Sequence, residues 1–162
     1  MEHMRVEEND YQLIAEAQKA IRLNYDQEHH NHTVGAAVRC KNGSVYVGVN
    51  LYSLHGACAE QVAIGTAITN GEREFEAVVA VRGKEGEEVI PPCGNCRQIL
   101  HDYMPDCGVI VFADGELKKN QGKRTAAFFL FGRISSGLRG NMFEVRERYP
   151  RADSDAPAFR IK

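Results

Sequence analysis

Residues 77–83 (AVVAVRG) form a run in which no charged residue appears before Arg82. A strand with one exposed face alternates apolar and polar side chains, whereas an unbroken apolar run is typical of a strand that is buried on both faces. Residues 108–113 have the same character and end at Asp114-Gly115. Together these runs predict a central sheet that is covered on both sides.

Three segments have the pattern of helices that could cover such a sheet. Apolar residues recur at helical spacing in residues 9–26, where Asn9 or Asp10 is placed to cap the helix start. Residues 57–69 and 93–103 have the composition of two further helices.

Residues 32–51 change to the pattern of a strand pair, because two β-rich runs flank Lys41-Asn42-Gly43. An Asn-Gly pair between apolar runs is a strong hairpin signal. The resulting order is helix-strand-strand-helix-strand-helix-strand. It predicts an α/β fold, a three-layer α/β/α domain with a mixed central β-sheet.

Length and composition limit the class of protein. The chain has 162 residues, 43% of them hydrophobic, and a mean hydropathy of −0.39, which is typical of a domain that buries its own core. No apolar run approaches the ~18 residues of a membrane span, and the acidic start MEHMRVEEND is unlike a signal peptide. We therefore expect a cytoplasmic protein that has no membrane partner. Its five cysteines are then more typical of reduced thiols or metal ligands than of disulfides.

Charge divides the chain into two unequal parts. Residues 1–116 hold 9 Lys and Arg against 18 Asp and Glu, whereas residues 117–162 hold 11 against 4. We expect the first part to be the functional domain and the second to be a divergent basic segment, poorly ordered from Ser135 onward. A basic segment can follow nucleic-acid phosphates, but this charge density is more typical of a solvated tail.

Two short segments carry the candidate chemistry, Cys58-Ala59-Glu60 and Cys93-Gly94-Asn95-Cys96. Each follows a predicted strand and opens a predicted helix. Cys93 and Cys96 are three residues apart, so their sulfurs point to one side of a first helical turn, and Cys58 adds a third ligand. Helix N-termini carry partial positive charge, which favours the thiolates that bind metal. The pattern predicts one Zn²⁺ per subunit.

Glu60 extends the metal site to a hypothesis about an enzyme. Residues two apart in a helix point in nearly opposite directions, so Cys58 and Glu60 share one site only if it lies beyond the helix start. Three protein ligands leave a fourth zinc position for water, and a neighbouring carboxylate can move its protons. The alternatives are a redox-active cysteine pair, or a closed structural site with Cys40 or Cys107 as fourth ligand. These two cysteines are, however, more typical of small buried residues.

At these residues the sequence resembles the cytidine deaminase family. The matching pieces lie in the family's order within residues 10–115, and comprise residues 33–37 (TVGAA), 48–50 (GVN), 58–60 (CAE) and 92–98 (PCGNCRQ). The resemblance implies that Cys58, Cys93 and Cys96 hold Zn²⁺ and that Glu60 shuttles protons while water deaminates a cytosine ring and ammonia is released. It also implies a homotetramer, a nucleoside substrate and a zinc deaminase domain over residues 1–116.

Within the family the finer resemblance is to the blasticidin S deaminases, whose substrate carries a modified sugar. Cytidine deaminases typically read Asn-x-Glu-Asn after the second strand and use the first Asn and the Glu to hold the ribose. Here Asn50 is followed by Tyr52 at the position of the Glu. The resemblance implies substrate contacts from Asn50, Tyr52 and Thr33.

We therefore expect a zinc-dependent hydrolytic deaminase of cytosine nucleosides that is similar to the blasticidin S deaminases and confers antibiotic resistance. One alternative is a cytidine or deoxycytidine deaminase of pyrimidine salvage. Another is a non-enzymatic zinc domain that binds nucleic acid through its basic tail.

The position after Glu60 departs from the family. Gln61 stands where many members have Arg, so the negative charge of three thiolates on Zn²⁺ is expected to be offset by the two helix ends and by Arg97.

Overall fold

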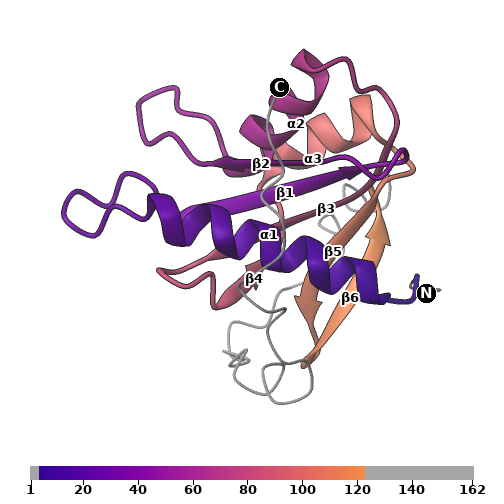
Figure 1. The fold of residues 1–162 in the computed structure, drawn as a ribbon, viewed down its shortest axis with the longest axis horizontal. Helices are drawn as coiled ribbons and strands as arrows, with labels where there is room; N and C mark the ends of the chain where they lie inside the picture. The colour runs from indigo at the N-terminus through magenta and orange to yellow at the C-terminus, as the bar shows by residue number, and fades with distance from the viewer. Residues whose placement is uncertain (1–3, 123–162) are drawn as a thin grey trace.

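A mixed sheet runs through the molecule, with helices on both of its faces (Figure 1). The structure, a computed structural model, describes residues 4–122. The elements in chain order are α1 (Glu8–Asn24), β1 (Val34–Cys40), β2 (Val45–Val49), α2 (Ala59–Thr69), β3 (Phe75–Arg82), β4 (Glu88–Ile90), α3 (Gly94–Tyr103), β5 (Gly108–Ala113) and β6 (Glu116–Gln121). No helix within this range is long and apolar enough to cross a membrane.

The strand order of the sheet is β2-β1-β3-β5-β6, and β4 pairs with the C-terminal part of β3. Strands β3 and β5 are parallel, whereas the other pairs are antiparallel. The predicted hairpin joins β1 to β2, and Gly43 in its turn has a φ of 89°. The sheet is therefore mixed, as the sequence predicts.

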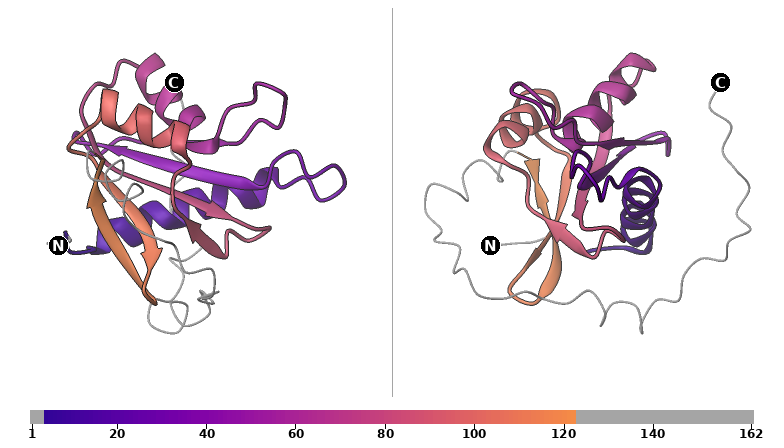
Figure 2. Two further views of the ribbon diagram at one scale, coloured as in Figure 1. Left: turned by 180° about the vertical axis from the view of Figure 1, so that it is seen from behind. Right: turned by 90° about the vertical axis from the view of Figure 1, so that its left-hand side faces the viewer.

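Different helices cover the two faces of the sheet (Figure 2). Helix α1 packs on one face, and α2 and α3 pack on the other. Strand β3 contributes alternate residues to both cores, with Ala77, Val79 and Val81 facing α1 and Val78 and Ala80 facing α2 and α3. This burial on both sides explains the unbroken apolar run, and the predicted three-layer α/β/α fold is confirmed.

Two glycines let the helices approach the sheet closely. A Cβ on Gly35 of β1 would lie 2.5 Å from the carbonyl oxygen of Ala17 in α1. A Cβ on Gly48 of β2 would lie 2.5 Å from the backbone nitrogen of Ala63 and 2.8 Å from the carbonyl oxygen of Ala59, both in α2. Because any larger residue at Gly48 would displace α2, this contact fixes the first turn of that helix against the sheet.

The start of α1 differs from the prediction. The N-cap residue is Glu7, and Asp10 occupies the third helical position. There the Asp10 carboxylate accepts a hydrogen bond from the Glu7 backbone N–H at 3.0 Å, as in a capping box. Neither Asn9 nor Asp10 is the N-cap residue, because the helix begins earlier than its apolar pattern indicates.

The C-terminal end of the sheet differs as well. Strand β6 pairs along the whole of β5 after a turn in which Asp114 and Gly115 have φ values of 54° and 83°. Residues 117–121 therefore belong to the folded unit, and the predicted boundary after residue 116 cuts through a strand. The segment ELKKNQ is too polar to indicate a strand from its sequence. In the structure, Lys119 is the one residue of this strand that is buried. The predicted basic tail beyond residue 122 lies outside the described residues.

A group of ion pairs lies near the C-terminal end of β1, and we call it the charge cluster: Asp10, Arg39, Lys119 and the half-buried Glu76. Arg39 donates to Asp10 at 2.8 Å and to Glu76 at 2.9 Å, while Lys119 donates to both carboxylate oxygens of Asp10 at 3.1 Å. Asp10, Arg39 and Lys119 are each at most 6% exposed. Burial alone raises the pKa of Asp10, but hydrogen bonds from Arg39, the Glu7 backbone and Lys119 outweigh it and hold the pKa below its ordinary value of 3.8.

Candidate metal centre

The starts of two helices meet at the opposite end of β1 from the charge cluster. Cys58 is the N-cap residue of α2 and Cys93 is the N-cap residue of α3, each with an extended backbone. Cys96 lies one turn into α3. The predicted placement of both cysteine segments at helix starts is confirmed, and the positive ends of two helix dipoles face the same point.

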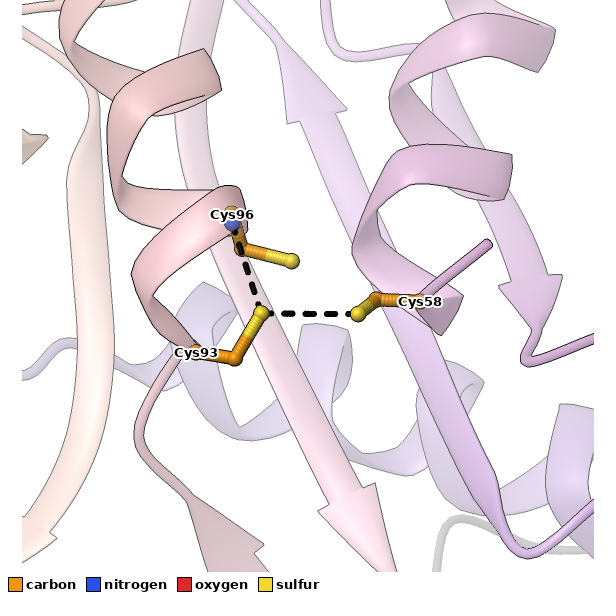
Figure 3. A group of neighbouring side chains, drawn as sticks. All are labelled: Cys58, Cys93 and Cys96. Carbon is orange, nitrogen blue, oxygen red and sulfur yellow. Dashed lines mark hydrogen bonds between the residues drawn. The ribbon is translucent and has the colours of Figure 1, made fainter. Parts of the chain in front are cut away.

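The three cysteine side chains converge between these helices (Figure 3). Their sulfur atoms all lie within 4.8 Å of one another. The Sγ atoms of Cys58 and Cys93 are 3.4 Å apart, and the Cys93 Sγ accepts a hydrogen bond from the Cys96 backbone N–H at 3.4 Å. Two sulfurs bound to zinc at ~2.3 Å in a tetrahedral site lie about 3.8 Å apart, so the spacing of the cluster fits a zinc ion.

Charge also makes this donor set suitable for a cation. Burial raises the pKa of the Cys58 thiol to about 11 and raises the pKa of Cys96 as well. Burial acts in the same direction on Cys93, but hydrogen bonds from the Cys96 backbone and from Cys58 outweigh it and lower the Cys93 pKa. All three sulfurs can therefore be thiolates at neutral pH only with a cation between them. Sulfur ligands in this number fit Zn²⁺.

The other two cysteines lie elsewhere in the fold. Cys40 and Cys107 are buried in the core between the sheet and the α2–α3 layer. Burial raises the pKa of Cys40 to about 11 and that of Cys107 to about 12. The prediction that both are small buried residues is confirmed, and within residues 4–122 neither one joins the three-sulfur group.

Glu60 shares a cavity with two of the three cysteines, Cys58 and Cys93. It is the second residue of α2 and is only 5% exposed. Burial raises the pKa of its carboxyl group, although its own backbone N–H and Cys96 oppose that shift. Because the cavity lies beyond the helix start, both Cys58 and Glu60 line it in spite of their spacing of two residues.

The cavity has a volume of about 350 Å³. It is formed by the β2–α2 loop, the start of α2 and the segment between β4 and α3. Its lining residues are Val34, Asn50, Leu51, Tyr52, Ser53, Gly56, Ala57, Cys58, Ala59, Glu60, Ile90, Pro91 and Cys93. Sequence reasoning missed Ile90, the last residue of the unpredicted strand β4, and Pro91, which follows it. The proline pair directly before Cys93 was the available signal for that wall.

The three residues predicted to contact substrate have different positions. Tyr52 lines the cavity and is 79% exposed, so its ring stands at the opening. Asn50 also lines the cavity, but its Oδ1 atom accepts hydrogen bonds from the backbone N–H groups of Thr33 and Val34 at 2.8 and 2.9 Å. Thr33 is outside the lining. Asn50 therefore joins the start of β1 to the cavity wall, and its Nδ2 donates to the Asn31 carbonyl at 3.3 Å.

Comparisons with known proteins agree with this geometry. Residues 7–112 match the family model described as the cytidine and deoxycytidylate deaminase zinc-binding region. The chain is 37% identical over 128 residues to the blasticidin-S deaminase of Bacillus cereus, an alignment that covers 74% of this chain and 90% of that protein. It is also 37% identical over 95 residues to the cytidine deaminase of Sporosarcina psychrophila, covering 56% of this chain and 67% of that protein.

A solved structure supports the same fold. The crystal structure of cytidine deaminase from Burkholderia pseudomallei superposes with a TM-score of 0.57 at 31% identity. The superposition covers 71% of this chain and 94% of that one. The shared region therefore spans nearly all of the solved protein.

Proposed function

The chain belongs to the cytidine and deoxycytidylate deaminase family and is a zinc-dependent hydrolytic deaminase, and from this premise we propose that its substrate is a cytosine nucleoside of the blasticidin S type. One observation carries the proposal. Three cysteine sulfurs lie within 4.8 Å of one another, and two of them, Cys58 and Cys93, line a cavity together with the buried carboxylate of Glu60. We assign Cys58, Cys93 and Cys96 as the zinc ligands and Glu60 as the catalytic residue.

The chemistry requires one water molecule to replace the amine of the ring by a carbonyl oxygen and release one ammonia. Zinc, when bound, supplies a Lewis acid that lowers the pKa of water toward about 7. The carboxylate of Glu60 takes a proton from the attacking water, delivers it to the neighbouring ring nitrogen, and then assists the departure of ammonia. Because Glu60 is buried, the proton that it carries is kept from bulk water.

Tyr52 supports the preference for a modified sugar. The position offers a phenol where the resemblance places a carboxylate, so the hydroxyl of an ordinary ribose loses a charged acceptor. A hydrogen bond to a charged group contributes about 1.5–3 kcal/mol. The identity to the Bacillus cereus protein, over 90% of its length, supports the same substrate and, with it, a role in antibiotic resistance. The relation to the Sporosarcina psychrophila enzyme favours cytidine or deoxycytidine as the second candidate.

The resemblance also supports a homotetramer in the cytoplasm. Reduced cysteines, which zinc binding needs, are maintained by the thiol pools of that compartment. Light scattering on the full chain should give four times the chain mass of 18.1 kDa, and a monomeric mass would contradict this assembly.

The function is tested by measuring ammonia release from blasticidin S, cytidine and deoxycytidine, offered separately to the zinc-loaded protein. We expect turnover of blasticidin S to exceed that of cytidine by at least about tenfold, the equivalent of 1.4 kcal/mol. In Glu60→Gln, zinc content should stay at the wild-type level while kcat falls by about 10²–10⁴-fold. A zinc-loaded wild-type protein that releases ammonia from none of the three compounds would contradict the proposal.

A variant of the cavity wall sharpens the choice between substrates. Tyr52 is exposed, so Tyr52→Glu should fold normally while it restores a carboxylate at this position. The ratio of kcat/KM for cytidine to that for blasticidin S should rise. An unchanged ratio would remove Tyr52 from the determinants of specificity.

A further inference from the structure

The side chain of Gln61 has one satisfied polar atom and one that is not. Its Oε1 atom accepts a hydrogen bond from the Cys58 backbone N–H at 3.1 Å. Its Nε2 atom is buried and has no hydrogen-bond partner within the described residues 4–122. A buried donor without a partner costs about 1–3 kcal/mol, so the amide group needs an acceptor that is not yet in place.

The position of the amide narrows the choice of that acceptor. Oε1 and Nε2 are bonded to the same carbon, so the contact with the Cys58 N–H also holds Nε2 near Cys58. In addition, Gln61 and Cys58 form a capping box, in which the Gln61 backbone N–H faces the Cys58 side chain. The Cys58 sulfur therefore lies beside Gln61. As a zinc-bound thiolate, this sulfur is a stronger hydrogen-bond acceptor than a thiol.

Helices α2 and α3 place different charged residues beside the cysteine sulfurs. On α3, the guanidinium of Arg97, which follows Cys96 directly, is buried and donates to the Pro92 carbonyl at 3.0 Å. On α2, the sequence AEQVAIGTAIT holds no Lys or Arg, and Glu60 is the acidic residue of its first turn. Three thiolates around Zn²⁺ leave one excess negative charge, so a donor is most needed on the α2 side.

We propose that Gln61 is a positioning residue for the metal centre. Its Nε2 donates to the Cys58 thiolate when that sulfur holds zinc, while its Oε1 keeps the Cys58 backbone in place. This inference rests on the proposed function, which assigns Cys58 as a zinc ligand. Residues that hydrogen-bond to metal ligands typically change metal affinity by about 10–100-fold when replaced.

Three substitutions test the Nε2 donor and the Oε1 acceptor of Gln61 separately. Gln61→Met has a similar size and lacks both groups, Gln61→Glu keeps an acceptor for the Cys58 N–H but loses the donor, and Gln61→Lys keeps a donor but loses the acceptor. Gln12→Glu, at an exposed position of α1, controls for the added charge. Zinc affinity of the full-length chain is measured by competition with a chromogenic chelator. Cobalt-loaded protein gives a second readout through its near-ultraviolet sulfur-to-metal absorption band.

We expect Gln61→Met and Gln61→Glu to bind zinc about 10–100-fold more weakly and to shift the cobalt band. Gln61→Lys and Gln12→Glu should stay within about threefold of the wild type, which is below that range. Wild-type affinity in Gln61→Met would overturn the inference. So would normal affinity in Gln61→Glu combined with a loss in Gln61→Lys, because that result would assign Gln61 to capping alone.

Failure of the proposed function has a different signature. It would appear as a wild-type chain that does not bind one zinc, or as a Cys58→Ser variant that keeps its zinc. The Gln61 outcomes, in contrast, are measured against a wild-type protein that binds zinc fully.

Discussion

The two ends of β1 hold two groups of ionisable side chains that are built in opposite ways. Near Arg39, two cations face two carboxylates, and the charge cluster is neutral in itself. Near Val34, three cysteines and Glu60 converge, and every one of them becomes negative on ionisation. The first group is complete within the chain, whereas the second needs a cation from outside. Unbalanced charge therefore marks the functional end of this sheet, and balanced charge marks the end that stabilises the fold.

The largest expected effect comes from removing a sulfur at the unbalanced end. Cys93→Ser should lower bound zinc from one per chain to nearly none and abolish ammonia release, because two sulfurs do not hold the ion. Metal content is measured by elemental analysis of the purified protein. Cys107→Ala, which changes a buried cysteine outside the group, should keep its zinc. Full zinc content in Cys93→Ser would remove the contrast between the two ends.

A smaller effect is expected at the balanced end. Arg39→Met leaves the buried Asp10 with Lys119 as its remaining cation and, through the lost charged hydrogen bonds, should lower the free energy of unfolding by about 1.5–3 kcal/mol. Zinc content and the KM for substrate should not change. The matched control is Arg82→Met, which breaks an exposed pair with Glu88 and should cost about 0–1 kcal/mol. Urea unfolding of the zinc-loaded chains measures both. Equal losses in the two variants would show that the charge cluster does not stabilise the fold.

The smallest effect is the acid response of the same cluster. The pKa of Asp10 is lower in the folded chain than its ordinary value of 3.8. Its carboxylate therefore contributes stability that is fully present above that value and is lost as the pH falls through the folded pKa. The difference in unfolding free energy between the wild type and Asp10→Asn should shrink below pH 3.8. Taking the difference cancels the contribution of the cysteines, and a constant difference would contradict the assignment.

The sequence predicts the unbalanced end better than the balanced one for a physical reason. The spacing of Cys93 and Cys96 is a local property of one helical turn, and the Cys58 segment repeats the same arrangement after another strand. The apolar run of β3 likewise predicts the burial of that strand from local sequence alone. In contrast, Lys119 donates a hydrogen bond to Asp10 over a separation of 109 residues in the chain. No local sequence pattern predicts such a pair.

Other misses have the same origin. Strand β4 has three residues and only Val89 among them is buried, so its pairing with β3 leaves almost no trace in the sequence. The substrate contact of Asn50 stays a prediction from the resemblance, whereas its hydrogen bonds to the start of β1 were missed because they depend on how two distant segments meet. The unpaired amide of Gln61 could be found only once its neighbours were in place.

Cys58 and Cys93 are the residues at which their helices begin, and this couples metal occupancy to backbone motion. The backbone amides of the first turns of α2 and α3 lie next to the sulfurs, so they open to solvent whenever either cysteine leaves its position. Zinc should therefore slow hydrogen–deuterium exchange in these two turns more than in the rest of each helix. Exchange rates at two separate sequence positions would then report one event, the arrival of a single ion.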